Sequence, residues 1–152
     1  MRILIDTNIL LRCVEPLHAQ HLTSTNAVSV LRKDDHDLAI VPQGLYEFWS
    51  VATRPLGGNG PGLSVSDAQS ELTALKRLFR LLRDERAVYA EWEHLVTTHD
   101  VKGKKAHDAR LVAAMHRHAM THVLSFNVGD FARYSSVIPL LPDDVERGTV
   151  RV

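Results

Sequence analysis

The chain has 152 residues, a length typical of one compact domain. Its hydrophobic fraction of 45% and charged fraction of 24% are those of ordinary globular proteins, which excludes disordered, collagen-like and coiled-coil classes. The 18 basic residues balance the 18 acidic ones, which argues against indiscriminate binding to polyanions but allows a local basic patch. The single cysteine, Cys13, has no internal disulfide partner, and no apolar stretch approaches the roughly 18–20 residues of a membrane helix. We therefore expect a single domain over residues 1–152 that is soluble and cytoplasmic.

Short apolar runs alternate with amphipathic segments along the chain. In chain order we expect a strand over 2–5, a helix starting near 9, a helix over 18–32, a strand over 38–41, a helix over 42–54, a loop over 55–62, helices over 66–81, 87–100 and 106–119, a strand over 122–125, a turn at 127–129 and a strand over 137–140. Ser66 followed by Gln69 resembles a capping box at the start of its helix. This alternation predicts an α/β fold whose parallel sheet is covered by helices on both faces. Ligands bind such sheets outside the carboxyl ends of the strands, so residues that follow strands are the first candidates for function.

Asp6 directly follows the first expected strand and precedes Thr7 and Asn8. All three residue types favour positions that cap the start of a helix. A carboxylate at the carboxyl end of a parallel strand also suits a functional site. The spacing leaves both roles open for Asp6, helix cap and functional acid.

Asp108 lies on the apolar stripe of its expected helix, three and four residues before Leu111 and Val112. An unpaired carboxylate directed inward is costly, so Asp108 has to meet a cation, hydrogen-bond donors or a proton. One interpretation is a helix cap that satisfies its own backbone. The other is a metal ligand, whose ionised form the positive end of the helix favours. The inward position favours the ligand.

Three further polar residues are not selected by spacing. Asp130 and Asn127 come after the strand 122–125, where a helix cap and a turn residue are the ordinary interpretations. Glu47 faces away from the apolar stripe of its helix, a position that usually indicates a solvated face. The pattern alone therefore assigns no function to these residues.

Several other catalytic motifs are missing from the sequence. It contains no Gly-x-Ser-x-Gly elbow, no Gly-Lys-Ser/Thr phosphate loop and no His-Glu-x-x-His zinc motif. The nine histidines lack a set of zinc partners, and we expect His107 to be an exposed spectator. Lys102, Lys104 and Lys105 precede Asp108 in a basic loop that is either simply solvated or in contact with phosphates.

Four segments, taken together, resemble a known family. They are Ile-Leu-Ile-Asp-Thr-Asn-Ile-Leu at 3–10, Leu-Tyr-Glu-Phe-Trp at 45–49, His-Asp-Ala-Arg-Leu-Val-Ala at 107–113 and Leu-Ser-Phe-Asn-Val-Gly-Asp-Phe at 124–131. Each is weak alone, but their order on an alternating α/β pattern is similar to that of PIN domains, and more specifically of VapC-like toxins of bacterial toxin–antitoxin pairs.

The resemblance implies a three-layer α/β/α fold with a short, mostly parallel central sheet and a metal-dependent endoribonuclease activity. It also implies a site of four acids. In this sequence those acids map to Asp6, Glu47, Asp108 and Asp130. The resemblance thus selects Glu47, which the helical pattern assigns to the surface.

The fourth acid is the least settled of the set. The family often has an Asp soon after the fourth strand and another before a Phe, and here Asn127 and Asp130 occupy those places with one extra residue between them. We take Asp130 as the acid. Asn8, Ser125 and Asn127 are then neighbours that support the site or contact the substrate.

The ligand types and the resemblance together imply cofactors and partners. Hard carboxylate oxygens without Cys or His suit Mg²⁺ or Mn²⁺ rather than zinc, and such ions activate water toward a phosphodiester. The resemblance implies an RNA substrate, a homodimer and a VapB-like antitoxin whose tail covers the active site, often with an inserted Arg. Exposed apolar residues within 65–82 are candidates for such contacts, although core packing explains them equally well. No membrane partner is expected.

Two other functions compete with the nuclease. A phosphohydrolase of the haloacid-dehalogenase type also places an Asp after its first strand, but it expects a second Asp two residues later, where this chain has Asn8. A non-catalytic PIN-like module that binds RNA or protein would keep the acids without assembling a productive metal site. Weak metal binding together with RNA or antitoxin binding would distinguish this module from the nuclease.

Overall fold

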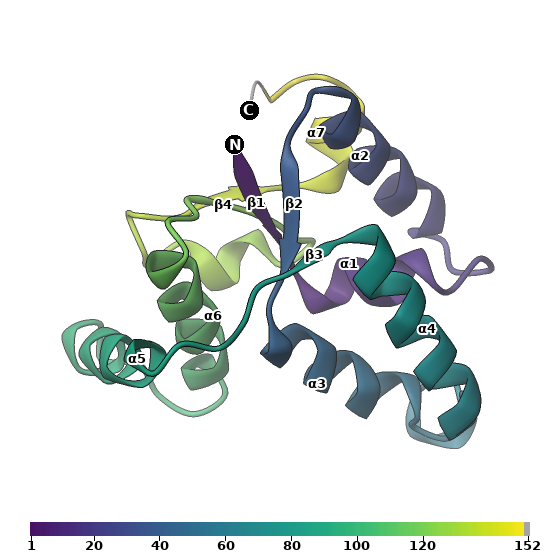
Figure 1. The fold of residues 1–152 in the computed structure, drawn as a ribbon, viewed down its shortest axis with the longest axis horizontal. Coiled ribbons are helices and arrows are strands. Elements are labelled where there is room, and N and C mark those ends of the chain that lie inside the picture. Colours follow the sequence, from purple (N-terminus) through teal and green to yellow (C-terminus); the bar gives the residue numbers. More distant parts are fainter. Residues whose placement is uncertain (151–152) are drawn as a thin grey trace.

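An all-parallel, five-stranded sheet runs through the centre of the protein, as seen in a computed structural model that describes residues 1–150 (Figure 1). The strands are β1 (Arg2–Ile5), β2 (Asp37–Ile40), β3 (Arg80–Leu81), β4 (His122–Leu124) and β5 (Ile138–Leu140). Their order in the sheet is β3-β2-β1-β4-β5. The chain extends the sheet to one side of β1 and then crosses to the other side. The point where the strand order reverses therefore lies between β1 and β4, which is where such sheets bind ligands.

Helices cover both faces of the sheet and confirm the expected three-layer α/β/α architecture. They are α1 (Thr7–Cys13), α2 (His21–Lys33), α3 (Pro42–Ala52), α4 (Val65–Leu78), α5 (Ala87–Thr98), α6 (Lys105–Arg117) and α7 (Pro142–Glu146), with 3₁₀ turns η1 (Leu56–Gly58) and η2 (Val128–Phe131). In Figure 1, α5 and α6 lie together to the left of the strands, and α1, α2 and α4 lie to the right. No helix within residues 1–150 is both long and apolar enough to cross a membrane.

The two layers of core follow from the alternation of side chains along each strand. Ile3 and Ile5 belong to the cluster that packs under α1, α2 and α3, whereas Leu4 between them belongs to the cluster under α5 and α6. Because both faces are covered, the strands are almost continuously apolar, as is usual for parallel sheets. Two hydrophobic cores thereby hold the carboxyl ends of β1, β2 and β4 in fixed positions.

The sequence predictions of the elements differ from the structure mainly at the ends. The helix expected over 66–81 ends earlier, at Leu78, because the chain turns extended and forms β3, a strand that the sequence analysis missed. Its predicted cap was wrong. Ser64, not Ser66, caps α4 by accepting the backbone N–H of Asp67 at 3.0 Å, and its hydroxyl donates to the Asp67 carboxylate at 2.7 Å. The short helix α7 was also missed.

Candidate active site

The four predicted acids come from four different elements at the carboxyl edge of the sheet. Asp6 follows β1, Glu47 lies on α3 after β2, Asp108 lies in the first turn of α6, and Asp130 lies in η2 after β4. The backbone N–H of Asp6 bonds to the carbonyl of Leu124 at 3.1 Å, which extends the pairing of β1 and β4 to the position of the acid. The edge at which the strand order reverses is therefore lined by carboxylates.

Asp6 has both of the roles that the sequence left open. Its side chain accepts the backbone N–H of Thr7 at 2.7 Å and so caps α1. Its other carboxylate oxygen accepts the Ser125 hydroxyl at 2.6 Å and the Asn8 amide at 2.8 Å. Only 9% of Asp6 is exposed. The cap and the site therefore share one carboxylate, which is fixed by three donors.

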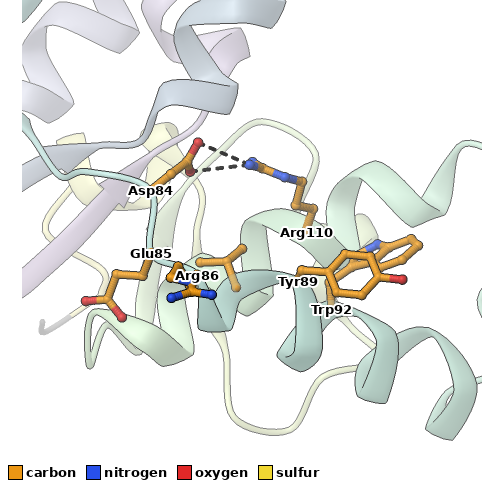
Figure 2. A pocket seen from close by; sticks show the side chains of 7 residues that line it. Asp84, Glu85, Arg86, Tyr89, Trp92 and Arg110 are labelled. Carbon is orange, nitrogen blue, oxygen red and sulfur yellow. Dashed lines mark hydrogen bonds and ion pairs between the residues drawn. The ribbon is translucent and has the colours of Figure 1, made fainter.

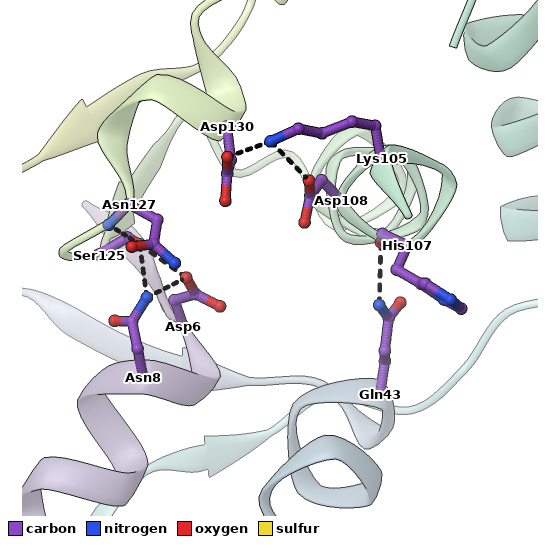
Figure 3. Close-up of polar contacts among 9 residues, drawn as sticks. All are labelled: Asp6, Asn8, Gln43, Lys105, His107, Asp108, Ser125, Asn127 and Asp130. Carbon is purple, nitrogen blue, oxygen red and sulfur yellow. Dashed lines mark hydrogen bonds and ion pairs between the residues drawn. The ribbon is translucent and has the colours of Figure 1, made fainter. Parts of the chain in front are cut away.

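A small polar cluster joins Asn8 and Ser125 around Asp6, as Figure 3 shows. The Asn8 amide also donates to the Ser125 hydroxyl oxygen at 3.0 Å, and the Asn8 carbonyl oxygen accepts the backbone N–H of Phe126 at 3.2 Å. The backbone N–H of Asn127 donates to the Ser125 hydroxyl oxygen at 3.0 Å. These bonds tie the turn after β4 to the start of α1, so Asn8 and Ser125 position Asp6.

Glu47 is held from two sides. The Thr7 hydroxyl donates to one of its carboxylate oxygens at 2.9 Å, and the Gln43 amide donates to the other at 2.8 Å. Gln43 is buried and also donates to the backbone carbonyl of His107 at 2.9 Å. The interpretation of Glu47 as part of a solvated helix face was wrong, because this side of α3 faces α1 and α6 rather than solvent.

Asp108 and Asp130 are joined by a lysine. The Lys105 ammonium pairs with the Asp130 carboxylate and lies 3.7 Å from a carboxylate oxygen of Asp108 (Figure 3). Asp108 does not cap α6, since the residue at the cap position is Lys104. Asn127 contacts the site through its backbone N–H. Of the two residues weighed for the fourth acid, Asp130 is thus the one whose side chain is held beside another acid.

Burial and mutual repulsion of these acids shift their proton affinities. Burial raises the pKa of Asp6 to about 6, against the lowering effect of its hydrogen bonds to Ser125 and Thr7. The negative charges of Glu47 and Asp108 raise the Asp6 pKa as well. Burial, followed by the charge of Asp130, also raises the pKa of Asp108. Each of these carboxylates therefore destabilises the ionised form of another.

The donor set fits a hard divalent cation in charge and in chemistry. Four carboxylates offer only oxygen ligands, which Mg²⁺ and Mn²⁺ prefer, and a divalent ion would relieve the repulsion recorded in the pKa of Asp6. Within residues 1–150, however, no three His, Cys, Asp or Glu side chains are gathered closely enough to hold an ion. A cation is nevertheless accommodated here, since Lys105 occupies the space between two of the acids.

Asn8 and Ser125 were expected as neighbours that support the site, but the contacts that hold Glu47 and join Asp108 to Asp130 were missed. Thr7 and Gln43 orient Glu47, and Lys105 pairs with two carboxylates. Gln43 stands one helical turn before Glu47, so the i, i+4 spacing was a usable signal. The contact of Thr7 with a residue forty positions away had no local signal. His107 is exposed, as expected, and only its backbone carbonyl contacts the network.

Comparison with known proteins shows the fold. No protein-family model and no curated protein sequence matches the chain. Among solved structures, VapBC2 from Rickettsia felis, bound to a promoter DNA fragment, aligns with a TM-score of 0.72 at 15% identity over 93% of this chain and 98% of that one. VapC20 from Mycobacterium tuberculosis, described as a Sarcin-Ricin loop cleaving toxin, aligns with a TM-score of 0.65 at 17% identity over 87% of this chain and 95% of that one.

A third structure, a toxin–antitoxin complex from Klebsiella pneumoniae, aligns with a TM-score of 0.60 at 19% identity over 90% of this chain and 95% of that one. The coverage is nearly complete on both sides in all three comparisons. The chain therefore has the PIN-like fold of VapC-type toxins, the family that its sequence resembles.

Proposed function

We propose that this chain is an endoribonuclease that depends on a divalent metal ion and acts as the toxin of a toxin–antitoxin pair. The observation that carries the proposal is the position of Asp6, Glu47, Asp108 and Asp130 on four elements along the edge where the strand order of the sheet reverses. Burial, with a smaller contribution from the neighbouring carboxylates, raises the pKa of Asp6 to about 6 and also raises the pKa of Asp108. Asp6 and Glu47 form no ion pair among residues 1–150, and a bound divalent cation would supply the positive charge that these two acids lack.

The residues of the chain divide into ligands and supports. In the proposal Asp6 and Asp108 are the principal metal ligands, and Glu47 and Asp130 complete the pocket. Bound Mg²⁺ or Mn²⁺ supplies an activated water and charge stabilisation at phosphorus. Asn8 and Ser125 keep Asp6 in place, and Thr7 and Gln43 do the same for Glu47. No side chain has to act as a general base, which agrees with the exposed position of His107.

The chemistry of the cut ends tests this proposal. When water attacks phosphorus and the bond to the 3′ oxygen breaks, that oxygen takes up a proton and the products carry a 3′ hydroxyl and a 5′ phosphate. Attack by the 2′ hydroxyl of the RNA would instead leave a 2′,3′-cyclic phosphate. We expect fragments that ligate through their 5′ phosphate without prior kinase treatment. Cyclic phosphate ends, or cutting that persists in EDTA, would contradict the proposal.

Lys105 is expected to compete with the metal ion. Its ammonium already pairs with Asp108 and Asp130, so its removal leaves these carboxylates free for a cation. We predict that Lys105→Gln tightens Mn²⁺ binding about 2- to 5-fold, an effect scaled to a partly exposed ion pair. Titration followed by electron paramagnetic resonance of free Mn²⁺ measures the affinity.

Lys104→Gln is the matched control for Lys105→Gln. It removes the same charge one residue away, and Lys104 is exposed and makes no ion pair among residues 1–150. Equal effects of the two variants would show that only the overall charge matters. Weaker Mn²⁺ binding by Lys105→Gln than by Lys104→Gln would contradict the competition.

We also propose that the chain forms a homodimer and binds a VapB-like antitoxin. Structural relatives of the chain include a toxin–antitoxin complex. The space between Asp108 and Asp130 accepts the ammonium of Lys105, so a cationic side chain from a VapB-like antitoxin fits the chemistry of the same pocket. Such an antitoxin would block the nuclease by displacing the metal ion.

The two alternative functions are weaker. A haloacid-dehalogenase-type enzyme needs an acid at position 8, whereas the Asn8 amide donates to Asp6 and Ser125, as an aspartate could not. A non-catalytic RNA- or protein-binding module has no need for four acids at one edge of the sheet. It would bind RNA or an antitoxin but bind Mn²⁺ only weakly and cut no RNA, and this combination distinguishes it from the nuclease.

A further inference from the structure

A cavity of about 530 Å³ opens on the same edge of the sheet as the acids. Its lining comes from the segment between β3 and α5, from α5 and from α6, and it is largely apolar with a few charged groups (Figure 2). The lining residues are Asp84, Glu85, Arg86, Val88, Tyr89, Trp92 and Arg110. None of the four acids of the candidate active site belongs to it. A cavity of this size and mixed character is typical of a site for a small molecule or a part of one.

Among the charged side chains that line the cavity, the Arg86 guanidinium has no ion-pair partner within residues 1–150. Arg110 pairs with both carboxylate oxygens of Asp84 at 3.3 Å, as Figure 2 shows, and Arg117 pairs with Glu85 at 3.3 Å. Arg86 is exposed and has no ion-pair partner among residues 1–150. The cavity therefore combines an apolar interior with an uncompensated positive charge, which is complementary to a ligand with a flat apolar part and an anionic group.

Two aromatic rings form one end of the cavity. The ring centroids of Tyr89 and Trp92 lie 5.7 Å apart, and both side chains appear together at one side of Figure 2. The Trp92 indole N–H donates to the carbonyl of Ala106 at 2.9 Å, so this ring is fixed. Tyr89 is 64% exposed, so its ring is accessible to a ligand. An exposed ring against a fixed one is a stacking platform for a base.

Hydrogen bonds connect the cavity to the acids. The Arg110 guanidinium donates to the side-chain oxygen of Gln43 at 3.0 Å, and the side-chain amide N–H of Gln43 donates to the Glu47 carboxylate at 2.8 Å. The sheet gives the same spatial relation, because Asp84 follows β3 and Asp6 follows β1, with β2 between them. The cavity and the acids therefore lie along the same edge of the sheet, which one RNA strand can follow.

From these observations we infer that the cavity binds an unpaired nucleobase of the RNA substrate, next to the phosphodiester held at the acids. The base stacks on Tyr89 beside Trp92, Arg86 contacts a neighbouring phosphate, and the Asp84 carboxylate accepts hydrogen bonds from the base edge. This inference rests on the proposed function and adds to it a preference for unpaired RNA. It also gives Arg110 a positioning role, since Arg110 contacts both the cavity and the Gln43 side chain that holds Glu47.

The test compares binding with and without bases. The full chain carrying Asp6→Asn is titrated in Mg²⁺ against dye-labelled short oligoribonucleotides of A, C, G or U, and against an abasic oligomer of the same charge, with fluorescence anisotropy as the readout. Tyr89→Leu is added to remove the ring, and Tyr89→Phe to keep it. Tyr89 is largely exposed, so neither change should disturb folding.

We expect Tyr89→Leu to weaken binding of at least one base-bearing oligomer by about 5-fold or more, while Tyr89→Phe stays within about 2-fold. Neither variant should change the affinity for the abasic oligomer. Arg86→Gln should weaken all oligomers, the abasic one included. The inference would be overturned if Tyr89→Leu and the parent protein bound every oligomer with equal affinity, or if Tyr89→Leu lost as much affinity for the abasic oligomer as for the others. Absence of RNA binding, or binding of a protein in the cavity instead, would overturn it as well.

Cleavage separates this inference from the proposed function. If Tyr89→Leu in the otherwise unchanged chain cuts and binds RNA as well as the parent, the nuclease stands and the base site falls. If no form of the protein cuts RNA but the binding still depends on the Tyr89 ring, the base site is supported, the protein is an RNA-binding module, and the proposed nuclease activity is contradicted.

Discussion

Asp6→Asn is expected to abolish RNA cleavage, with a loss of at least about 10²- to 10³-fold, while the fold is retained. The asparagine has nearly the same shape and keeps the carbonyl oxygen that caps α1 through the N–H of Thr7. It removes the negative charge that a divalent cation requires at the centre of the site. Initial cleavage rates on a single RNA substrate, together with circular dichroism, measure the two effects.

Asp108→Asn should reproduce this loss, because Asp108 lies at the same edge of the sheet and its charge acts on Asp6. Asp35→Asn is the matched control. Asp35 is exposed and has a positive φ of 58°, a conformation that asparagine adopts readily, so this change should leave the cleavage rate unaltered. Full activity of both Asp6→Asn and Asp108→Asn would remove the proposed site.

The second large effect concerns stability and its dependence on pH. Burial raises the pKa of Asp6 to about 6 from an ordinary value near 3.8, so the folded protein binds this proton more tightly than the unfolded chain. The stabilisation from this proton is fully present below about pH 4 and is lost as pH rises to about 6. The shift corresponds to a cost of about 3 kcal/mol above pH 6 in the absence of metal.

We therefore predict that the difference in stability between metal-free Asp6→Asn and wild type changes with pH, because only wild type loses the contribution of this proton. Relative to wild type, the variant's free energy of unfolding should increase by about 2–3 kcal/mol between pH 4 and pH 7.5. The lost hydrogen bonds from Ser125 and Asn8 lower the variant's stability at both pH values and so cancel in the comparison. Urea denaturation in EDTA measures the difference. A difference that does not change with pH would contradict the raised Asp6 pKa.

Metal binding should reverse the advantage of the variant. An ion that binds only the folded state raises stability in proportion to the logarithm of its concentration, and it binds wild type more tightly because Asp6 is ionised there. Saturating Mg²⁺ or Mn²⁺ at pH 7.5 should therefore raise the melting temperature of wild type more than that of Asp6→Asn. Equal rises would place the ion elsewhere.

The strands and most helices can be predicted from the sequence because burial on both faces leaves clear apolar runs. The central strand at 2–5 and the amphipathic helix with Leu111 and Val112 are examples. The strand β3 has no such signal, since both of its residues are exposed and its sequence continues the pattern of α4. The helix α7 has only five residues, too few for periodicity to appear.

The candidate site is only partly predictable for the same physical reason. Asp108 is detectable because a carboxylate on an apolar stripe is anomalous wherever it occurs. Glu47 is not, because the donors that hold it include Thr7 from a distant segment, and helical periodicity cannot distinguish solvent from a polar neighbour. The resemblance to the toxin family identified Glu47 where the pattern did not. The pair of Lys105 with Asp108 follows the i, i+3 spacing of a helix, but its pair with Asp130 depends on the packing of α6 against η2 and has no local signal.

The decisive measurement is cleavage of a total small-RNA pool by the purified chain in Mg²⁺, Mn²⁺ or EDTA, beside Asp6→Asn. We expect discrete fragments in the presence of either metal, which disappear in EDTA, return when Mg²⁺ is added back, and are absent with the variant. Their mapped ends would identify the target. If folded, antitoxin-free wild type and Asp6→Asn both leave the pool intact in every condition, the acids do not form a nuclease site and the account is contradicted.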